Sequence, residues 1–329
     1  MSEETWTVAV YGATGALGEE IRAGLEGVDV GLERLLPVAG VRSAGTTVPW
    51  RGAQVAVVGP GEVDPSAVDV AVLAAPRDVA AQAIPGLRDR GALVVDLTGA
   101  RRVSGEPLPV LWPKLADADL ESHPGGFALP AGAASTAAPV VAALATLGRL
   151  SEVSAVELVG ATDAGRGGAE ALSAQTVAML SYKPVEAGPF RDVLAFNTLE
   201  EPAEAAEARQ ARFTDELRSL LPAVDARYRL TTVRVPVFSN TTVTVEARFG
   251  AAAPDVEAVT AALAAGVGLD LRPAGAALRD ASDNDDVLVC AVRADDGGVV
   301  RMVLHADPLH RLGEATAALL ERVVSEDLW

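Results

Sequence analysis

Three evenly spaced glycines near the N-terminus are the residues whose spacing most clearly indicates ligand chemistry. The segment VAVYGATGALGEEI places Gly12, Gly15 and Gly18 after an apolar run and at the start of a helical pattern. Such glycines permit a tight strand-to-helix turn, let the backbone approach a pyrophosphate and allow close packing of helix on strand. The sequence therefore predicts a dinucleotide-binding turn whose members are Gly12, Thr14, Gly15, Ala16, Leu17 and Gly18. The alternative is a tight turn that binds no ligand.

The residues after the second apolar run indicate which dinucleotide this is. An NAD site usually carries Asp or Glu there, to accept a hydrogen bond from the ribose 2′-hydroxyl. This chain has AGVRSAG instead, with Arg42 and Ser43 and no acid. Because a guanidinium suits a 2′-phosphate, the segment predicts NADP in preference to NAD. The alternative is that Arg42 is an ordinary solvated loop charge.

Nucleophiles and bases are scarce. The single cysteine, Cys290, stands inside the alternating apolar segment VLVCAV, which predicts a small buried residue. The three histidines are His123, His305 and His310. Ser135 and Thr136 follow a loop of small residues at a predicted helix start, where capping of the helix is expected. A serine nucleophile would need a neighbouring base, and the sequence offers none beside them.

The elements that must position these residues fall into two patterns. Over the first 130 residues, near-continuous apolar runs alternate with helical patterns, which is typical of a parallel sheet covered on both faces. We expect strands at 7–12, within 32–43, at 68–76 and at 92–99, and helices at 19–27 and 80–91, the second interrupted by Pro85.

From about Leu150 the pattern becomes alternating and rich in Val and Thr, which indicates antiparallel strands with one covered face. We expect strands at 153–161, within 228–249, at 285–295 and at 299–307, and helices at 167–181, 206–222 and 313–329. The fold class is thus α/β: a doubly wound, Rossmann-type domain (1–130, with a helix of about 312–329 packing back on it) and an α+β domain with a mostly antiparallel sheet (131–311).

Composition excludes several classes of partner. The 329 residues carry a formal net charge of −18 and contain no basic run, so we expect no binding to nucleic acid or to anionic membranes. No window holds about 18 uninterrupted apolar residues, which predicts no transmembrane helix. One cysteine and the lack of a signal-peptide pattern predict a cytoplasmic protein.

A series of segments in order along nearly the whole chain resembles the aspartate-semialdehyde dehydrogenase family. These segments are GATGALGEE, RSAGTTV, GALVVDLTGARR, GGAEALSAQTVAMLSYKPVEAGPFRDVLAFNTLE, VRVPVFSNTTVTVEA, DNDDVLVCAVRADDGG and VVRMVLHADPLHRLGEA. The resemblance implies a homodimer that uses NADPH to reduce an aspartyl phosphate to its semialdehyde. It also implies a cysteine nucleophile, a histidine acid/base and an arginine pair that holds substrate carboxylate and phosphate.

The resemblance carries some of these roles onto residues of this chain. Arg102 in GARR and Arg234 in VRVPVF match the arginines that bind the small anionic substrate, and Arg166 and Gly167 in AGRGG are expected near the cofactor. The alternative for each arginine is a solvated surface charge.

Four other positions depart from the family pattern. The cysteine loop reads FALPAGAASTAAPVVAAL, so the cysteine position falls on Gly132 if aligned on Pro130, or on Ala134 if aligned on Ser135 and Thr136. Thr241 stands where the family has its acid/base histidine. Asp163 stands where the family has a glutamine, and Asp307-Pro308 stands where it has an Asp-Asn pair that contacts nicotinamide.

These departures predict an NADP-binding member of the family branch that lacks the catalytic cysteine, without the family's phosphorylating activity. One alternative is an active NADPH-dependent oxidoreductase that reduces the carbonyl group of an acidic small molecule directly. The other is a structural or regulatory dimer without catalysis.

Overall fold

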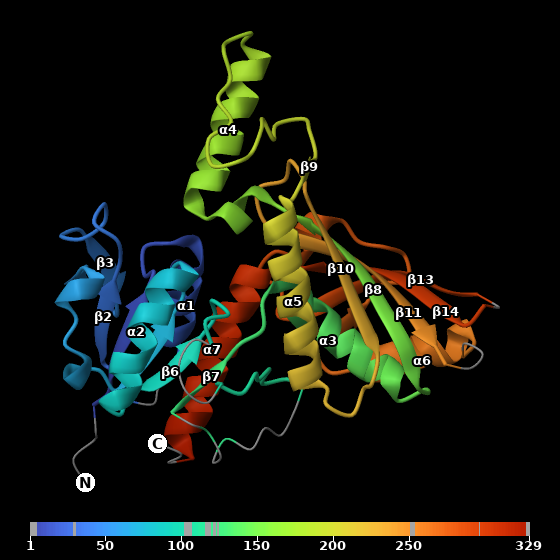
Figure 1. Cartoon of the computed structure of the whole chain (residues 1–329), viewed down its shortest axis with the longest axis horizontal. Helices are drawn as coiled ribbons and strands as arrows, with labels where there is room; N and C mark the ends of the chain where they lie inside the picture. The colour runs from blue at the N-terminus through green and yellow to red at the C-terminus, as the bar shows by residue number, and fades with distance from the viewer. Residues whose placement is uncertain are drawn as a thin grey trace. The chain divides into compact units, whose positions relative to one another are not determined.

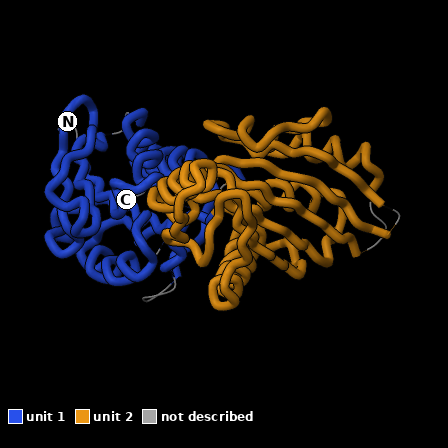
Figure 2. Tube along the Cα trace, turned by 90° about the horizontal axis from the view of Figure 1, so that it is seen from above, with its two compact units in different colours: residues 1–131, 309–329 blue, residues 132–308 orange. Residues whose placement is uncertain are grey.

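The computed structural model describes residues 5–28, 31–101, 107–115, 120, 123, 125–250, 254–295 and 297–326. The chain forms two compact units, which Figure 2 distinguishes by colour. Unit 1 comprises Met1–Ala131 and Leu309–Trp329, and unit 2 comprises Gly132–Pro308.

Unit 1 is built on a parallel sheet. In the described part of the chain its strand order is β2-β1-β5-β6-β7. The strands are β1 (Thr7–Tyr11), β2 (Arg34–Val38), β5 (Val70–Leu73), β6 (Leu93–Asp96) and β7 (Gly126–Ala128). Every residue of β5 and β6 is buried, as expected for apolar strands covered on both faces. The predicted doubly wound domain is confirmed.

The helices of unit 1 are α1 (Ala16–Glu26), α2 (Arg77–Asp89) and α7 (Pro308–Ser325) (Figure 1). Pro85 lies inside α2, so the prediction that it interrupts this helix is wrong. Its neighbours Ile84 and Leu87 are buried, and their packing offsets the hydrogen bond that proline removes. The sequence analysis also missed a small antiparallel hairpin, β3 (Thr47–Trp50) with β4 (Ala53–Ala56).

Unit 2 is built on a mixed sheet with the order β12-β13-β14-β11-β8-β10-β9 among its described residues. The strands are β8 (Leu150–Val159), β9 (Leu199–Glu200), β10 (Arg227–Arg234), β11 (Thr241–Phe249), β12 (Leu269–Leu271), β13 (Val287–Asp295) and β14 (Val299–Ala306). Most neighbours are antiparallel, as predicted, but β8 pairs with β10 and β12 with β13 in parallel.

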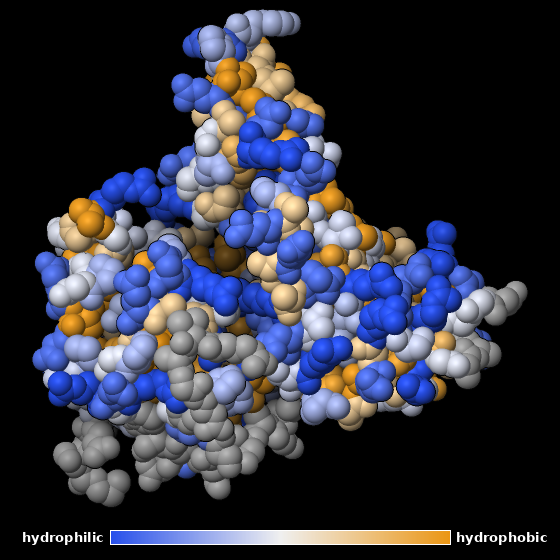
Figure 3. Space-filling model, viewed as in Figure 1, coloured by the Kyte–Doolittle hydropathy of each residue, from blue (hydrophilic) through white to orange (hydrophobic). Residues whose placement is uncertain are grey.

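Helices α3 (Gly132–Ala145), α5 (Ala203–Leu220) and α6 (Val256–Ala265) pack against this sheet. Helix α4 (Arg166–Leu180) instead extends away from it (Figure 1). Apolar side chains are exposed on and just after α4, where Figure 3 shows them as orange patches. They are Val177, Met179, Leu180, Tyr182 and Phe196. No helix in the described ranges has the length and apolarity needed to cross a membrane.

The packing of α7 on α1 depends on two glycines. A Cβ atom at Gly313 would lie 2.8 Å from the carbonyl oxygen of Glu20, and one at Gly24 would lie 3.0 Å from that of Gly313. Because both neighbours are backbone atoms, they cannot move aside without shifting a helix. The C-terminal helix therefore belongs structurally to unit 1.

We expect Gly313→Ala to lower the free energy of unfolding by roughly 1–3 kcal/mol, because the added methyl group overpacks this helix contact. Gly86→Ala is the matched control: Gly86 lies inside α2, and its added Cβ would come no closer than 4.0 Å to its neighbours. The control should be neutral or stabilise by up to about 1 kcal/mol. Denaturant unfolding of both variants measures this, and an equal effect would contradict the close α1–α7 contact.

Candidate functional site

The glycine turn of unit 1 holds its backbone in a form that side chains would prevent. Gly12 has φ +85°, and a Cβ there would lie 2.5 Å from the carbonyl oxygen of Ala74. A Cβ at Gly18 would lie 2.2 Å from the carbonyl oxygen of Gly12. Helix α1 begins directly after Gly15, and no side chain caps its N-terminus. The first turn of α1 thus offers backbone N–H groups to an anion.

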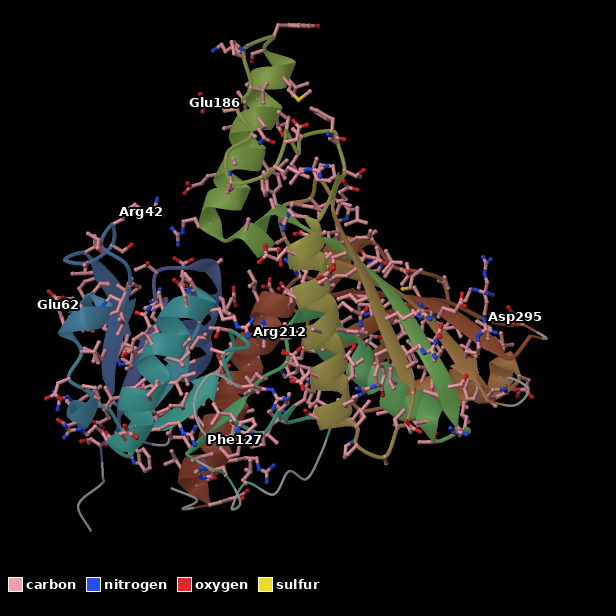
Figure 4. All side chains as sticks on the ribbon, viewed as in Figure 1. Arg42, Glu62, Phe127, Glu186, Arg212 and Asp295 are labelled. Atoms are coloured by element: carbon pink, nitrogen blue, oxygen red, sulfur yellow. The ribbon has the colours of Figure 1, made fainter. Side chains whose placement is uncertain are left out.

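This turn borders a cavity of about 540 Å³ in unit 1. Its lining includes the predicted residues Gly12, Thr14, Gly15, Arg42 and Ser43. Thr14 Oγ1 donates to Ser43 Oγ at 3.2 Å and so joins the turn to the loop after β2. Arg42 is the only charged side chain among the described lining residues, and it extends outward from its loop in Figure 4. The lining therefore combines backbone donors and one cation, which fits a phosphorylated nucleotide.

The other residues predicted to bind the cofactor do not line this cavity. Ala16 and Leu17 open α1 and are not among the residues that line the cavity, and Gly18 packs against the backbone of the turn itself. Arg166 and Gly167 begin α4 in unit 2. Arg102, predicted to bind the substrate, lies outside the described residues.

A second constellation lies in unit 2, where β8 and β10 run in parallel. Glu157 on β8 is only 4% exposed. Its Oε2 accepts a hydrogen bond from Thr232 on β10 at 3.2 Å and lies 3.8 Å from Nη1 of Arg209 on α5. Burial raises the pKa of Glu157 to about 7, although Arg209 and the hydrogen bond from Thr232 act in the opposite direction. Glu157 is thus a buried carboxyl group that exchanges its proton near neutral pH.

Arg234, predicted to hold the substrate carboxylate, already holds two carboxylates of the protein. Its Nη2 donates to Asp163 Oδ2 at 2.8 Å and to Glu201 Oε1 at 2.7 Å. Its guanidinium also lies 5.5 Å from the ring centre of Phe190. A substrate carboxylate would have to displace one of these partners, which removes much of the anion affinity that Arg234 alone would provide.

Asp163 joins the two arginines. It pairs with Arg209 as well as with Arg234. Burial raises the pKa of Asp163, but the two guanidinium groups outweigh that effect, and the resulting pKa lies below its ordinary value. Asp163 is therefore ionised and charge-paired near neutral pH, which does not suit a general base. No group of three metal-ligating side chains occurs in the part of the chain that the structure describes.

Gly132, one of the two candidates for the cysteine position, is the first residue of α3 and is half-buried. A Cβ atom there would lie 3.2 Å from Oε1 of Glu157 and 3.8 Å from Cβ of Pro308. The contact with Oε1 is tighter than most Cβ contacts in proteins. Ala134, the other candidate, is buried within the first turn of α3.

Ser135 and Thr136 do not cap α3, because the helix begins at Gly132, ahead of both; that prediction is wrong. Ser135 Oγ donates instead to the carbonyl oxygen of Gly132 at 3.0 Å. Thr241, predicted to replace the family's histidine, is buried, and its Oγ1 donates to the carbonyl oxygen of Leu158 at 3.1 Å. The hydroxyl groups of Ser135 and Thr241 thus bond to backbone carbonyls of unit 2, whereas the buried Thr136 Oγ1 has no hydrogen-bond partner among the described residues.

The remaining thiol and imidazole groups lie on other elements. Cys290 is buried in β13, where burial raises the pKa of its thiol and disfavours the reactive thiolate. His305 on β14 lies 2.9 Å from Thr242 Oγ1, and burial lowers the pKa of its imidazole. The His123 ring lies 4.8 Å from that of Phe127 in unit 1, tilted by 54°, and His310 on α7 lies 3.8 Å from Glu20.

The sequence analysis did not find Glu157, Glu201 or Arg209. For Glu157 a signal was present: it stands on the buried face of β8, in phase with Val153, Ala155 and Val159. A carboxylate at a buried position of an alternating strand indicates a paired or proton-binding group. For Arg209, which reaches this carboxylate from α5, we see no comparable signal.

Comparisons with known proteins identify the class. Residues 7–144 match the family model described as "Semialdehyde dehydrogenase, NAD binding domain". A USG-1 protein homolog from Pseudomonas aeruginosa is 29% identical over 95% of this chain and 96% of its own length. The aspartate-semialdehyde dehydrogenase of Bacillus subtilis is 28% identical over 70% of this chain and 69% of its own.

The solved structures agree with this class. A probable aspartate-semialdehyde dehydrogenase from Pseudomonas aeruginosa superposes with a TM-score of 0.88 at 27% identity, over 98% of this chain and 99% of that one. Unit 1 thus carries a semialdehyde dehydrogenase NAD-binding domain. Over nearly its whole length the chain is similar to aspartate-semialdehyde dehydrogenases, in line with the predicted resemblance.

We expect the stability of the protein to depend on the proton of Glu157. Because the pKa is raised from 4.5 to about 7 on folding, the stabilising contribution is full below pH 4.5 and is lost as the pH rises through 7. The loss amounts to roughly 3 kcal/mol. Glu157→Gln cannot titrate, so its free energy of unfolding relative to the unsubstituted protein should increase over this range and then level off.

Denaturant unfolding of both proteins at several pH values measures this difference. The matched control is Glu152→Gln on the same strand, which should change stability by less than roughly 0.5 kcal/mol at each pH. A parallel pH dependence in the Glu157→Gln variant and the unsubstituted protein would contradict a titrating Glu157.

Proposed function

We propose that this chain is an NADP(H)-binding member of its family that does not catalyse the family's phosphorylating aldehyde dehydrogenation. The observation that carries the proposal is the environment of residue 132. Glycine stands there with the carboxyl group of Glu157 against it, and Thr241 is held by a backbone carbonyl. The only thiol, Cys290, is buried on β13 with a raised pKa. Nucleophile and acid/base are both missing, and their effects are interdependent.

The cavity in unit 1 supports the choice of NADP over NAD. Its lining offers the backbone of the glycine turn for a pyrophosphate and Arg42 for a 2′-phosphate. None of the described residues that line it is an Asp or Glu, which an NAD site would use to accept from the ribose 2′-hydroxyl. We assign nucleotide binding to residues 1–130, together with the helix of about 312–329.

Substrate binding and dimerisation are assigned to residues 131–311. A homodimer is supported by the apolar side chains exposed along α4, since contiguous exposed apolar surface commonly marks an interface. Arg102 remains the candidate for a small anionic ligand, whereas Arg234 is already neutralised by Asp163 and Glu201. We propose a cytoplasmic location, consistent with a single reduced cysteine.

A second function, direct reduction of a carbonyl group, is favoured by Glu157. NADPH, when bound, supplies hydride, and such a reduction needs no cysteine. It needs a proton donor, and a carboxyl group with a pKa of about 7 can donate and recover a proton near neutral pH.

Titration with NADPH and NADH tests the cofactor assignment. We expect NADPH to raise the melting temperature, and Arg42→Ala to weaken NADPH binding by about tenfold or more while leaving NADH binding unchanged, because one charge-assisted contact is lost. Arg90→Ala is the matched control, since Arg90 is exposed in the same unit and does not line the cavity. Equal losses in both variants, or no response to either nucleotide, would overturn the assignment.

Assay of L-aspartate semialdehyde oxidation with phosphate and NADP tests the loss of the family reaction. We expect no turnover above the rate without protein, because no thiolate is available to form the acyl intermediate. Turnover within the ordinary enzymatic range of about 1–1,000 s⁻¹ would show that the proposal is wrong.

A further inference from the structure

Glu157 is held in place where it meets the start of α3. Thr232 from β10 donates to its Oε2, and Arg209 from α5 lies 3.8 Å from the same oxygen. Asp163 and Glu201 contribute negative charge nearby and are themselves tied to Arg234. The carboxyl group is therefore fixed from several elements, and its other oxygen, Oε1, is directed at Gly132.

Any side chain at residue 132 would require the Glu157 carboxyl group to shift by a few tenths of an ångström. A Cβ alone would come within 3.2 Å of Oε1, and the sulfur of a cysteine would extend further from the backbone. The neighbour that would have to move is a buried carboxyl group with two partners, and its displacement would cost those interactions.

We propose that Glu157 determines which chemistry this site supports, because its carboxyl group takes up the space beside residue 132 that a nucleophilic side chain would need. The inference rests on the proposed function in one respect, namely that Gly132 stands at the nucleophile position. It goes further because it names Glu157 as the residue whose position prevents covalent catalysis from residue 132. Replacing Gly132 by cysteine alone is then insufficient to create an accessible nucleophile.

Thiol alkylation tests this directly. Cys290→Ala removes the native thiol, and Gly132→Cys then introduces a single thiol beside Glu157. The rate of its reaction with iodoacetamide is measured with four residues at position 157: Glu, Gln, Asp and Ala. Glutamine keeps the volume without the charge, aspartate keeps the charge but withdraws it by one methylene, and alanine removes both.

If volume is what matters, Gly132→Cys reacts slowly with Glu or Gln at position 157, faster with Asp, and at least about tenfold faster with Ala than with Glu. Equal rates with all four residues would overturn the inference. Rates that rise with Gln as much as with Ala would also overturn it, because they would make charge rather than volume the cause. If the Ala variant does not fold, the Gln and Asp variants still decide between volume and charge. Alkylation is faster with Asp than with Gln if volume is the cause, and faster with Gln than with Asp if charge is the cause.

The matched control is Ala134→Cys, the alternative nucleophile position, in the same Cys290→Ala background. Its alkylation rate should not respond to Glu157→Ala; an equal acceleration would indicate general loosening of α3 and would contradict the inference. Dehydrogenase activity in the unsubstituted protein would refute the proposed function, whereas these alkylation rates test Glu157 independently.

Discussion

Mutual neutralisation of opposite charges beside the parallel pair of β8 and β10 is the constraint on which the candidate site in unit 2 depends. Asp163 forms ion pairs with both Arg209 and Arg234, and Glu201 forms a second ion pair with Arg234. Glu157 is the remaining acidic group; Arg209 lies 3.8 Å from it, and its raised pKa reflects the cost of burying its charge. Arg234, which the resemblance assigned to an anionic substrate, is thereby paired with carboxylates of the protein itself.

Unit 1 presents the opposite electrostatic situation. Its cavity is lined by backbone and small side chains, with Arg42 as its single charge among the described lining residues. On a chain with a formal net charge of −18, one arginine beside unpaired helix N–H groups is a local exception that favours an anion. The proposed nucleotide site and the proposed absence of a nucleophile therefore concern different units.

The fold could be predicted because its determinants are local. Apolar runs predicted β1, β2, β5 and β6 of unit 1 but not β7, and alternation predicted the longer strands of unit 2. Helix α2 continues past Pro85 because Ile84 and Leu87 are packed in the interior. This tertiary packing cannot be read from the local sequence pattern. The charge cluster was harder to predict, since Glu157, Asp163 and Arg209 lie on different elements that meet only through tertiary structure. The parallel pairing of β8 with β10, absent from an expectation of antiparallel strands, places Thr232 against Glu157.

The central proposal is that this chain, although it is similar to aspartate-semialdehyde dehydrogenases, forms no covalent acyl intermediate. The most direct measurement is the intact mass of the protein after incubation with L-aspartate semialdehyde and NADP in the absence of phosphate, conditions under which a thioester would accumulate. We predict an unchanged mass. An increase equal to one aspartyl group, located on a single side chain, would contradict the claim and identify the nucleophile.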